Sequence, residues 1–217
     1  MGSRAVFLDR DGVINPMVHH PEFGIVDSPG NAAEFSLLAG AGEAIARFNR
    51  LGLLVVVVSN QPGIAKKRFT VSQLDAMTNK MIRLVRRAGG KIDATYYCCH
   101  HPDAALPLYR KACQCRKPSP GMLLTAARKM SLDLGSCYMV GDGVSDILAG
   151  RAAGSTTLFV SSRKCYVCDD LERHNAQPDF LVRDLLSATD VIERLEKGNA
   201  RSLEKFSSVK CAIGQVR

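Results

Sequence analysis

The sequence predicts an α/β fold built on a mostly parallel central sheet. Short apolar runs that favour strands alternate along the chain with segments whose apolar residues recur every three or four positions, as in amphipathic helices. The run from Leu53 to Val58 is apolar throughout and rich in valine, which is typical of a strand buried on both faces. Helices are therefore expected on both faces of the sheet, in a three-layer, Rossmann-like arrangement.

The first half of the chain contributes three strands and two helices to this prediction. Gly52 ends the first helical pattern, and Thr70 with Gln73 forms a capping box that opens the second. Prolines and glycines without a clean period predict a long loop over 15–39. The expected strands are 5–8, 53–58 and 94–97, and the expected helices are 41–51 and 71–88.

The second half continues the alternation. A helix is expected after Pro120, and the polar segment 161–178 is expected to be irregular. The tail 197–217 is basic and weakly patterned, so the sequence predicts a single domain over 1–196 followed by this tail. The expected strands are 137–140, 156–160 and 180–182, and the expected helices are 121–130, 145–153 and 185–195.

Composition narrows the class of protein. The chain has 217 residues, 46% of them hydrophobic, which suits one packed domain. It has no apolar stretch of about 18 residues and no signal-peptide pattern, so we expect a cytoplasmic protein that does not span a membrane. The net charge of +8 suits an anionic partner. Because the charge is scattered and Trp is absent, we expect a small phosphorylated metabolite rather than nucleic acid, and a monomer.

Polar residues follow three of the expected strands. Asp9 and Asp11 follow the first; read alone, this pair could be an acidic turn, with Gly12 supplying a positive φ. Carboxyl ends of parallel strands lie at one edge of a sheet, where open α/β sheets bind ligands. Carboxylates there can hold Mg²⁺, and a hydroxyl and a lysine can bind the other oxygens of a phosphoryl group. The converging residues are Asp9 with Asp11, Ser59 with Asn60, Asp142 with Asp146, and Arg116 with Lys117.

A second cluster consists of cysteine and histidine. Cys98-x-His100 and, twelve residues further on, Cys113-x-Cys115 offer three thiolates and one imidazole, a closed tetrahedral set for structural Zn²⁺. The alternative is free thiols and a surface histidine. Cys165-x-x-Cys168 could be half of another zinc or redox site, or two unlinked thiols; without a second pair the latter is favoured.

These motifs resemble those of the haloacid dehalogenase superfamily: Asp-x-Asp-Gly-Val, a serine after the second strand, a lysine, and Gly-Asp-x-x-x-Asp. The stretches 9–15 (DRDGVIN), 59–65 (SNQPGIA) and 98–118, with its Cys/His pairs and Arg-Lys-Pro, look more narrowly like the D-glycero-D-manno-heptose 1,7-bisphosphate 7-phosphatases and the related histidinol-phosphate phosphatases. The resemblance runs from about Arg4 to Glu196 and implies a capless fold with a zinc-binding loop.

The resemblance also implies a role for each site residue. Asp9 would be the nucleophile, Asp11 the general acid and base, and Ser59 and Lys117 would hold the phosphoryl group. Mg²⁺ would bind the Asp9 carboxylate, the Asp11 carbonyl and Asp142, with Asp146 supporting the site from a helix N-terminus. Zn²⁺ would bind Cys98, His100, Cys113 and Cys115. The expected substrate contacts are Met17, Val18, His19, His20, Asn60, Gln61, Pro62 and Arg116.

The chain departs from the family pattern at two positions. Gly143 stands where the family commonly has a lysine, directly after the metal-binding aspartate, and Pro62 replaces a small polar residue. Both concern substrate choice more than reaction type. The expected activity is hydrolysis of the 7-phosphate of heptose bisphosphate through an aspartyl-phosphate. The alternatives are a phosphatase of histidinol phosphate or another small metabolite, and a nucleic-acid-binding or scaffold protein on the same fold; a scaffold should have lost Asp9 or Asp11.

Overall fold

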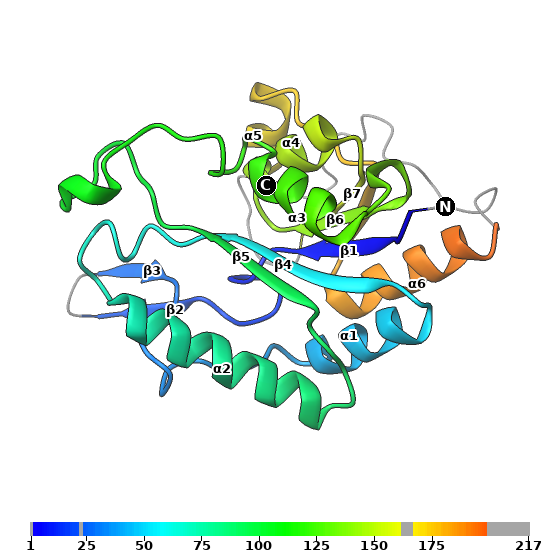
Figure 1. The fold of residues 1–217 in the computed structure, drawn as a ribbon, viewed down its shortest axis with the longest axis horizontal. Helices are drawn as coiled ribbons and strands as arrows, with labels where there is room; N and C mark the ends of the chain where they lie inside the picture. The colour runs from blue at the N-terminus through cyan, green and yellow to red at the C-terminus, as the bar shows by residue number, and fades with distance from the viewer. Residues whose placement is uncertain (1, 22–23, 162–166, 199–217) are drawn as a thin grey trace, which may run out of the picture.

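The computed structural model describes residues 2–21, 24–161 and 167–198, and it has a parallel sheet at its centre (Figure 1). The sheet has six strands in the order β5-β4-β1-β6-β7-β8, all paired in parallel. Its strands are β1 (Ala5–Leu8), β4 (Leu54–Asn60), β5 (Ala94–Cys98), β6 (Tyr138–Gly141), β7 (Thr156–Val160) and β8 (Phe180–Val182).

Helices cover both faces of this sheet, as predicted (Figure 1). Alternate residues of a strand point to opposite faces, so each central strand contributes to two cores. Val55 and Val57 of β4 join the core beneath one helical layer, whereas Val56 and Val58 join the other. The first layer comprises α1 (Ala41–Arg50), α2 (Val71–Arg87) and α6 (Leu185–Glu196); the second comprises α3 (Gly121–Met130), α4 (Val144–Ala153) and α5 (Val167–Arg173).

Strand β1 lies in the middle of the sheet. Its last residue, Leu8, pairs with Val57 of β4 on one side and with Val140 of β6 on the other. Strands β4 and β5 therefore lie on one side of β1, and β6, β7 and β8 lie on the other. This reversal of strand order is a topological switch point, the place where α/β folds bind ligands.

Two expectations about irregular segments are wrong. The segment 15–39 contains an antiparallel hairpin of β2 (Val18–His20) and β3 (Ile25–Asp27), the only second sheet among the described residues. The segment 161–178 contains helix α5. Short 3₁₀ turns, η1 (Pro107–Tyr109) and η2 (Leu134–Ser136), complete the elements. Within the described part of the chain, no helix is long and apolar enough to cross a membrane.

Candidate active site

The carboxyl ends of β1 and β6, with the first turn of α4, bring three of the predicted acidic residues together. Strand β1 ends at Leu8, and Asp9 follows it, tied back to β6 by a hydrogen bond from its backbone N–H to the Val140 carbonyl (3.0 Å). Carboxylate oxygens of Asp9, Asp142 and Asp146 lie within 4.8 Å of one another. Asp146 also accepts a hydrogen bond from the Gly143 N–H (3.0 Å), so it holds the N-terminus of α4 as expected.

Lys117 is the cation of this cluster, and its side chain is almost fully buried. Its Nζ donates to Asp9 Oδ1 (2.8 Å) and to the Val58 carbonyl (2.7 Å), and it lies 2.5 Å from Asp146 Oδ1. Burial lowers the pKa of Lys117, but the carboxylates of Asp146 and Asp9 outweigh burial and raise that pKa above its usual value. Lys117 is therefore a permanent positive charge beside Asp9.

Three carboxylates that lie this close together offer the oxygen ligands that a divalent cation such as Mg²⁺ prefers. Burial raises the pKa of Asp146 against the opposing effect of Lys117, a sign of how tightly charge is packed here. Gly12 lets Asp142 approach closely: its φ is 91°, and a Cβ there would lie 2.1 Å from Asp142 Oδ2. The donor set and the glycine together fit a Mg²⁺ site.

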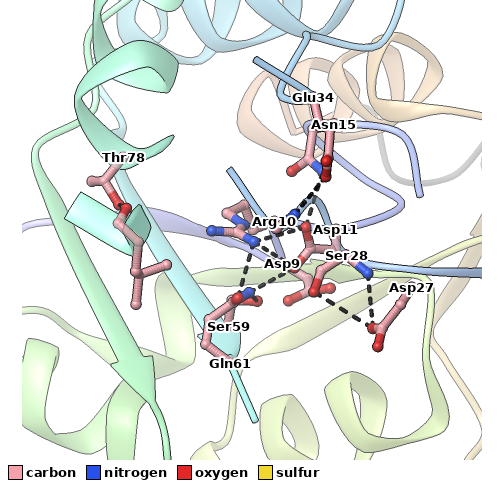
Figure 2. Close-up of polar contacts among 12 residues, drawn as sticks. Asp9, Arg10, Asp11, Asn15, Asp27, Ser28, Glu34, Ser59, Gln61 and Thr78 are labelled. Atoms are coloured by element: carbon pink, nitrogen blue, oxygen red, sulfur yellow. Dashed lines mark hydrogen bonds and ion pairs between the residues drawn. The ribbon is translucent and has the colours of Figure 1, made fainter. Parts of the chain in front are cut away.

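The Asp11 side chain is not part of this cluster of three carboxylates; it points toward Arg10 instead (Figure 2). The Arg10 guanidinium donates to both carboxylate oxygens of Asp11, at distances of 3.0 to 3.2 Å. Gln61 donates to Asp11 Oδ2 (2.6 Å), and Asn15 donates to Oδ1 (2.9 Å). Because β1 ends at Leu8, Asp9 and Asp11 are not alternate residues of one strand, and their side chains do not point to the same face.

Arg10 is a site residue that the sequence argument missed. Its side chain is fully buried, with the guanidinium carbon 6.0 Å from the Phe35 ring centroid and 5.8 Å from that of Tyr97. Burial by itself lowers the pKa of Arg10, but the charge of Asp11 raises it above its usual value. Its place between two motif carboxylates was the signal, and only the fold shows which of them it binds.

Several expected substrate contacts have protein partners of their own. Asn60 clamps the Lys117 backbone, because its amide donates to the Lys117 carbonyl and accepts from the Lys117 N–H (both 3.0 Å). Gln61 is fully buried and also donates to Ser59 Oγ (3.1 Å). Arg116 donates to the His100 carbonyl (3.2 Å). Val18, His19 and His20 form β2, and Pro62 follows β4.

A cavity of about 810 Å³ opens beside the carboxylates. Asp142 and Gly12 form its inner wall, and Met17 is the one predicted substrate contact among its lining residues. Most of the other lining residues are apolar. They are Val13 and Pro16 after β1, Val26 in β3, Leu38 and Ala39 before α1, Val160 at the end of β7 and Leu185 at the start of α6. The cavity therefore connects the carboxylate cluster to a largely apolar space, as expected for a small-molecule pocket.

The predicted zinc ligands converge in the loop after β5. Distances between the Sγ atoms of Cys98, Cys113 and Cys115 are 3.3 to 3.5 Å, and His100 Nδ1 lies 3.3 Å from Cys115 Sγ. Zn–S bonds of about 2.3 Å in a tetrahedron place sulfurs about 3.8 Å apart, so these donors fit Zn²⁺ with little movement. Burial, followed by the charge of Lys111, lowers the pKa of His100, which favours the neutral imidazole that a metal requires.

The neighbouring residues of the loop point elsewhere. Cys99 packs against the core under α1 and α2, and His101 Nδ1 accepts a hydrogen bond from the Asp103 N–H (3.1 Å). The i, i+2 register expected from the sequence therefore agrees with the positions of the side chains. The side chains of Cys165 and Cys168 lie outside the described part of the chain.

Comparisons with known proteins agree with the fold and the site. Residues 114–188 match the sequence model of a family described as HAD-hydrolase-like. A parallel sheet with paired carboxylates, a serine and a lysine at one edge, together with this match, defines a hydrolase of the haloacid dehalogenase type.

More specific relatives share most of the chain. The D-glycero-β-D-manno-heptose-1,7-bisphosphate 7-phosphatase of Escherichia coli (strain K12) is 35% identical over 194 residues, 89% of this chain and 95% of that protein. The phosphatase of the same name from Vibrio cholerae is 40% identical over 165 residues, 76% of this chain and 84% of that protein. The chain belongs to this family of phosphoric monoester hydrolases.

A solved structure extends the comparison to three dimensions. The crystal structure of D,D-heptose 1,7-bisphosphate phosphatase from B. bronchiseptica, complexed with magnesium and phosphate, has a TM-score of 0.73 and 30% identity to this chain. The similarity covers 89% of this chain and 99% of that one. The fold is thus similar to that of this family member over most of the chain.

Proposed function

We propose that this protein is a Mg²⁺-dependent phosphatase that removes the 7-phosphate of D-glycero-D-manno-heptose 1,7-bisphosphate through an aspartyl-phosphate intermediate. The observation that carries this proposal is the contact of Lys117 with Asp9 and Asp146, beside Asp142 and the cavity. The names of the relatives and the magnesium and phosphate in the Bordetella structure support the substrate and the metal.

In the first half of the reaction, an Asp9 oxygen attacks the phosphorus atom and the bond from phosphorus to the sugar oxygen breaks. Lys117 and Ser59 hold the phosphoryl oxygens, and the ammonium offsets the charge that develops on them. Asp11 enters this step as the protonated acid, gives its proton to the departing sugar oxygen and becomes the carboxylate that Arg10 holds. Because Lys117 already contacts Asp9, the phosphoryl group arrives where a positive charge is in place.

In the second half, water attacks the phosphorus atom of the aspartyl-phosphate and gives a proton to Asp11. The bond between phosphorus and the Asp9 oxygen breaks, so the Asp9 carboxylate is restored and inorganic phosphate leaves. Arg10, Asn15 and Gln61 fix the position of Asp11, and the carboxylate that they hold can accept the proton of the water (Figure 2).

Asp9, Asp142 and the Asp11 carbonyl would hold Mg²⁺, with Asp146 behind them. When bound, the ion supplies electrophilic activation of the phosphoryl group and balances its charge. Cys98, His100, Cys113 and Cys115 would hold Zn²⁺ in a closed set whose role is structural. Since Cys115 precedes Arg116 and Lys117 directly, the zinc loop would fix the backbone that carries the lysine.

The proposal is tested by phosphate release from a panel containing heptose 1,7-bisphosphate, histidinol phosphate and simple sugar monophosphates, each with and without Mg²⁺. We expect Mg²⁺-dependent release and the highest kcat/KM for the heptose bisphosphate. The highest kcat/KM for histidinol phosphate would reassign the substrate, and no release from any of them would overturn the enzymatic proposal.

Two substitutions test the chemistry. Asp9→Asn should abolish turnover while the protein remains folded, since an amide then replaces the attacking carboxylate. Asp11→Asn should slow turnover by about 10²–10⁴-fold because proton transfer is lost. Substantial Mg²⁺-dependent activity of Asp9→Asn would rule out the covalent route.

We also propose that residues 1–196 form the catalytic unit and that 197–217 is a dispensable tail on a monomeric, cytoplasmic protein. The C-terminal end of α6 supports this boundary: Glu196 accepts a hydrogen bond from the Tyr138 hydroxyl (2.7 Å) and pairs with Arg4, which ties the helix to the start of the sheet. A chain ending after Gly198 should keep the kcat/KM of the full chain and elute as a monomer.

A further inference from the structure

The cavity beside the carboxylates reaches from the reaction centre to the segment between β8 and α6. Its inner end is formed by Gly12 and Asp142, and Asp142 lies within 4.8 Å of Asp9 measured between carboxylate oxygens. Its far end is formed by Arg183, Asp184 and Leu185. A molecule whose reacting phosphate lies at Asp9 would therefore extend along this cavity.

Arg183 is the only cationic residue among those that line the cavity in the described part of the chain. Its side chain is 81% exposed, and its Nε donates to Asp184 Oδ2 (3.1 Å). The terminal Nη atoms make no hydrogen bond with any other described residue. The guanidinium thus retains two donor groups suited to phosphate oxygens.

Asp184 orients Arg183 through the Nε atom and leaves the two Nη atoms for a ligand. Its Oδ1 caps α6 by accepting from the backbone N–H and the hydroxyl of Ser187 (both 2.7 Å). Only Oδ2 faces Arg183. The carboxylate charge is therefore shared with the N-terminus of a 12-residue helix, which itself favours negative charge.

We propose that Arg183 binds the second, non-reacting phosphate of a bisphosphate substrate at the far end of the cavity. This inference rests on the proposed function. Gly143, which follows Asp142 in the chain, supplies no side chain for that purpose. Arg116, another arginine near the site, is not among the residues that line the cavity, and it donates to the His100 carbonyl.

The test compares kcat and KM for heptose 1,7-bisphosphate and for heptose 7-phosphate in the wild-type protein and in Arg183→Gln. We expect KM for the bisphosphate to rise about tenfold, with kcat nearly unchanged. The substitution removes a contact that is present in both the bound substrate complex and the transition state. KM for the monophosphate should change less than twofold. Arg183→Lys should recover part of the loss, since it keeps the charge but not the paired donors.

Arg173→Gln is the matched control, because Arg173 is also an exposed arginine paired with a nearby aspartate but does not line the cavity. It should leave both KM values unchanged. An equal rise of KM for both substrates in Arg183→Gln, or no rise for either, would overturn the role of Arg183 while leaving the phosphatase intact. A wild-type protein with equal kcat/KM for the two substrates would overturn the distal-phosphate site together with the bisphosphate assignment.

Discussion

Arg10 illustrates how one buried charge organises the site. A guanidinium out of water requires partners, and here it has the Asp11 carboxylate, the Gln61 carbonyl oxygen (2.9 Å) and two aromatic rings. The same contacts restrict the Asp11 side chain to one orientation. A lysine could supply the charge at position 10 but not the fork that reaches both oxygens of the carboxylate.

Gly143 offers a direct test of substrate choice at the residue scale. Gly143→Lys should lower KM for the heptose bisphosphate more than for the monophosphate, because a cation is added beside Asp142 that can meet a second phosphate. The backbone there is extended (φ −123°), which any residue adopts, but a new Cβ would lie 3.2 Å from Asp146 Oδ2, so the Asp146 carboxylate must shift by a few tenths of an ångström.

Gly135→Lys is the control for this substitution, since it adds the same charge in η2, which precedes β6 and so lies at the opposite edge of the sheet. It should alter neither KM. Equal effects of Gly143→Lys on both substrates would mean that a side chain at position 143 does not reach the distal phosphate.

Sequence reasoning predicted which residue types gather at the site but not how each side chain turns. The strand ends placed Asp9, Ser59 and Asp142 correctly because parallel strands share an edge. Asn60 and Gln61 were expected to face the substrate, yet one holds the Lys117 backbone and the other holds Asp11. These orientations depend on partners about fifty residues away, which a local pattern cannot reveal.

At the scale of elements, the zinc loop makes a prediction about register. Cys98→Ser and His100→Ala should lose bound zinc, since each removes one of four converging donors. Cys99→Ser and His101→Ala should keep nearly one zinc per chain, because their side chains face away from the cluster. The measurement is zinc content of the four purified variants. Loss from the second pair alone would place the register one residue off.

Helix α6 gives a prediction about stability and pH. Burial alone would raise the pKa of Asp184, but the hydrogen bonds from Ser187 outweigh it and hold that pKa below its usual value. The folded protein therefore favours the carboxylate. Asp184→Ala should cost about 1 kcal/mol of unfolding free energy near neutral pH, the usual effect of losing an N-cap.

This difference between wild type and Asp184→Ala should shrink on acidification. Because the pKa of Asp184 is lower in the folded protein, the carboxylate stabilises the fold fully at pH values above its unfolded-state pKa of about 3.9. This stabilisation is lost as the pH falls through the folded-state pKa. Urea unfolding at neutral pH and at several acidic pH values measures it. A difference that stayed constant down to the lowest pH would show that the carboxylate charge does not contribute.

The elements that the sequence missed are those whose stability comes from elsewhere. Strands β2 and β3 have three residues each, too few for a period to emerge, and each exists because it pairs with the other. Helix α5 has seven residues in a polar stretch. The long elements were predicted because their apolar faces are strong enough to be read locally, as in α2.

For the molecule as a whole, the charge of +8 has a testable consequence. Because the basic residues are scattered along the sequence in short clusters, binding to duplex DNA should be weak, in the micromolar range or above, and should weaken as salt rises. Fluorescence anisotropy at about 150 mM salt measures this. A nanomolar, sequence-selective complex would contradict the metabolite assignment.

The three-layer fold followed from the sequence because its most buried strands are nearly pure in apolar residues. Every residue from Val55 to Val58 is fully buried, and the two cores take alternate members of that run. The order of the strands in the sheet was not predicted. It depends on the side of β1 to which the chain crosses after each helix, and local sequence patterns do not indicate that side.

The two-residue step from Cys115 to Lys117 has a practical consequence for anyone who purifies this protein. A strong chelator would act on it twice: quickly, by removing an ion that fresh magnesium replaces, and slowly, by loosening the loop that carries the lysine. Adding magnesium back would reverse only the loss of magnesium and not the loosening of the loop. Stocks stored with chelator would lose specific activity with time although their sequence and concentration were unchanged, and the zinc content of each batch would account for the difference.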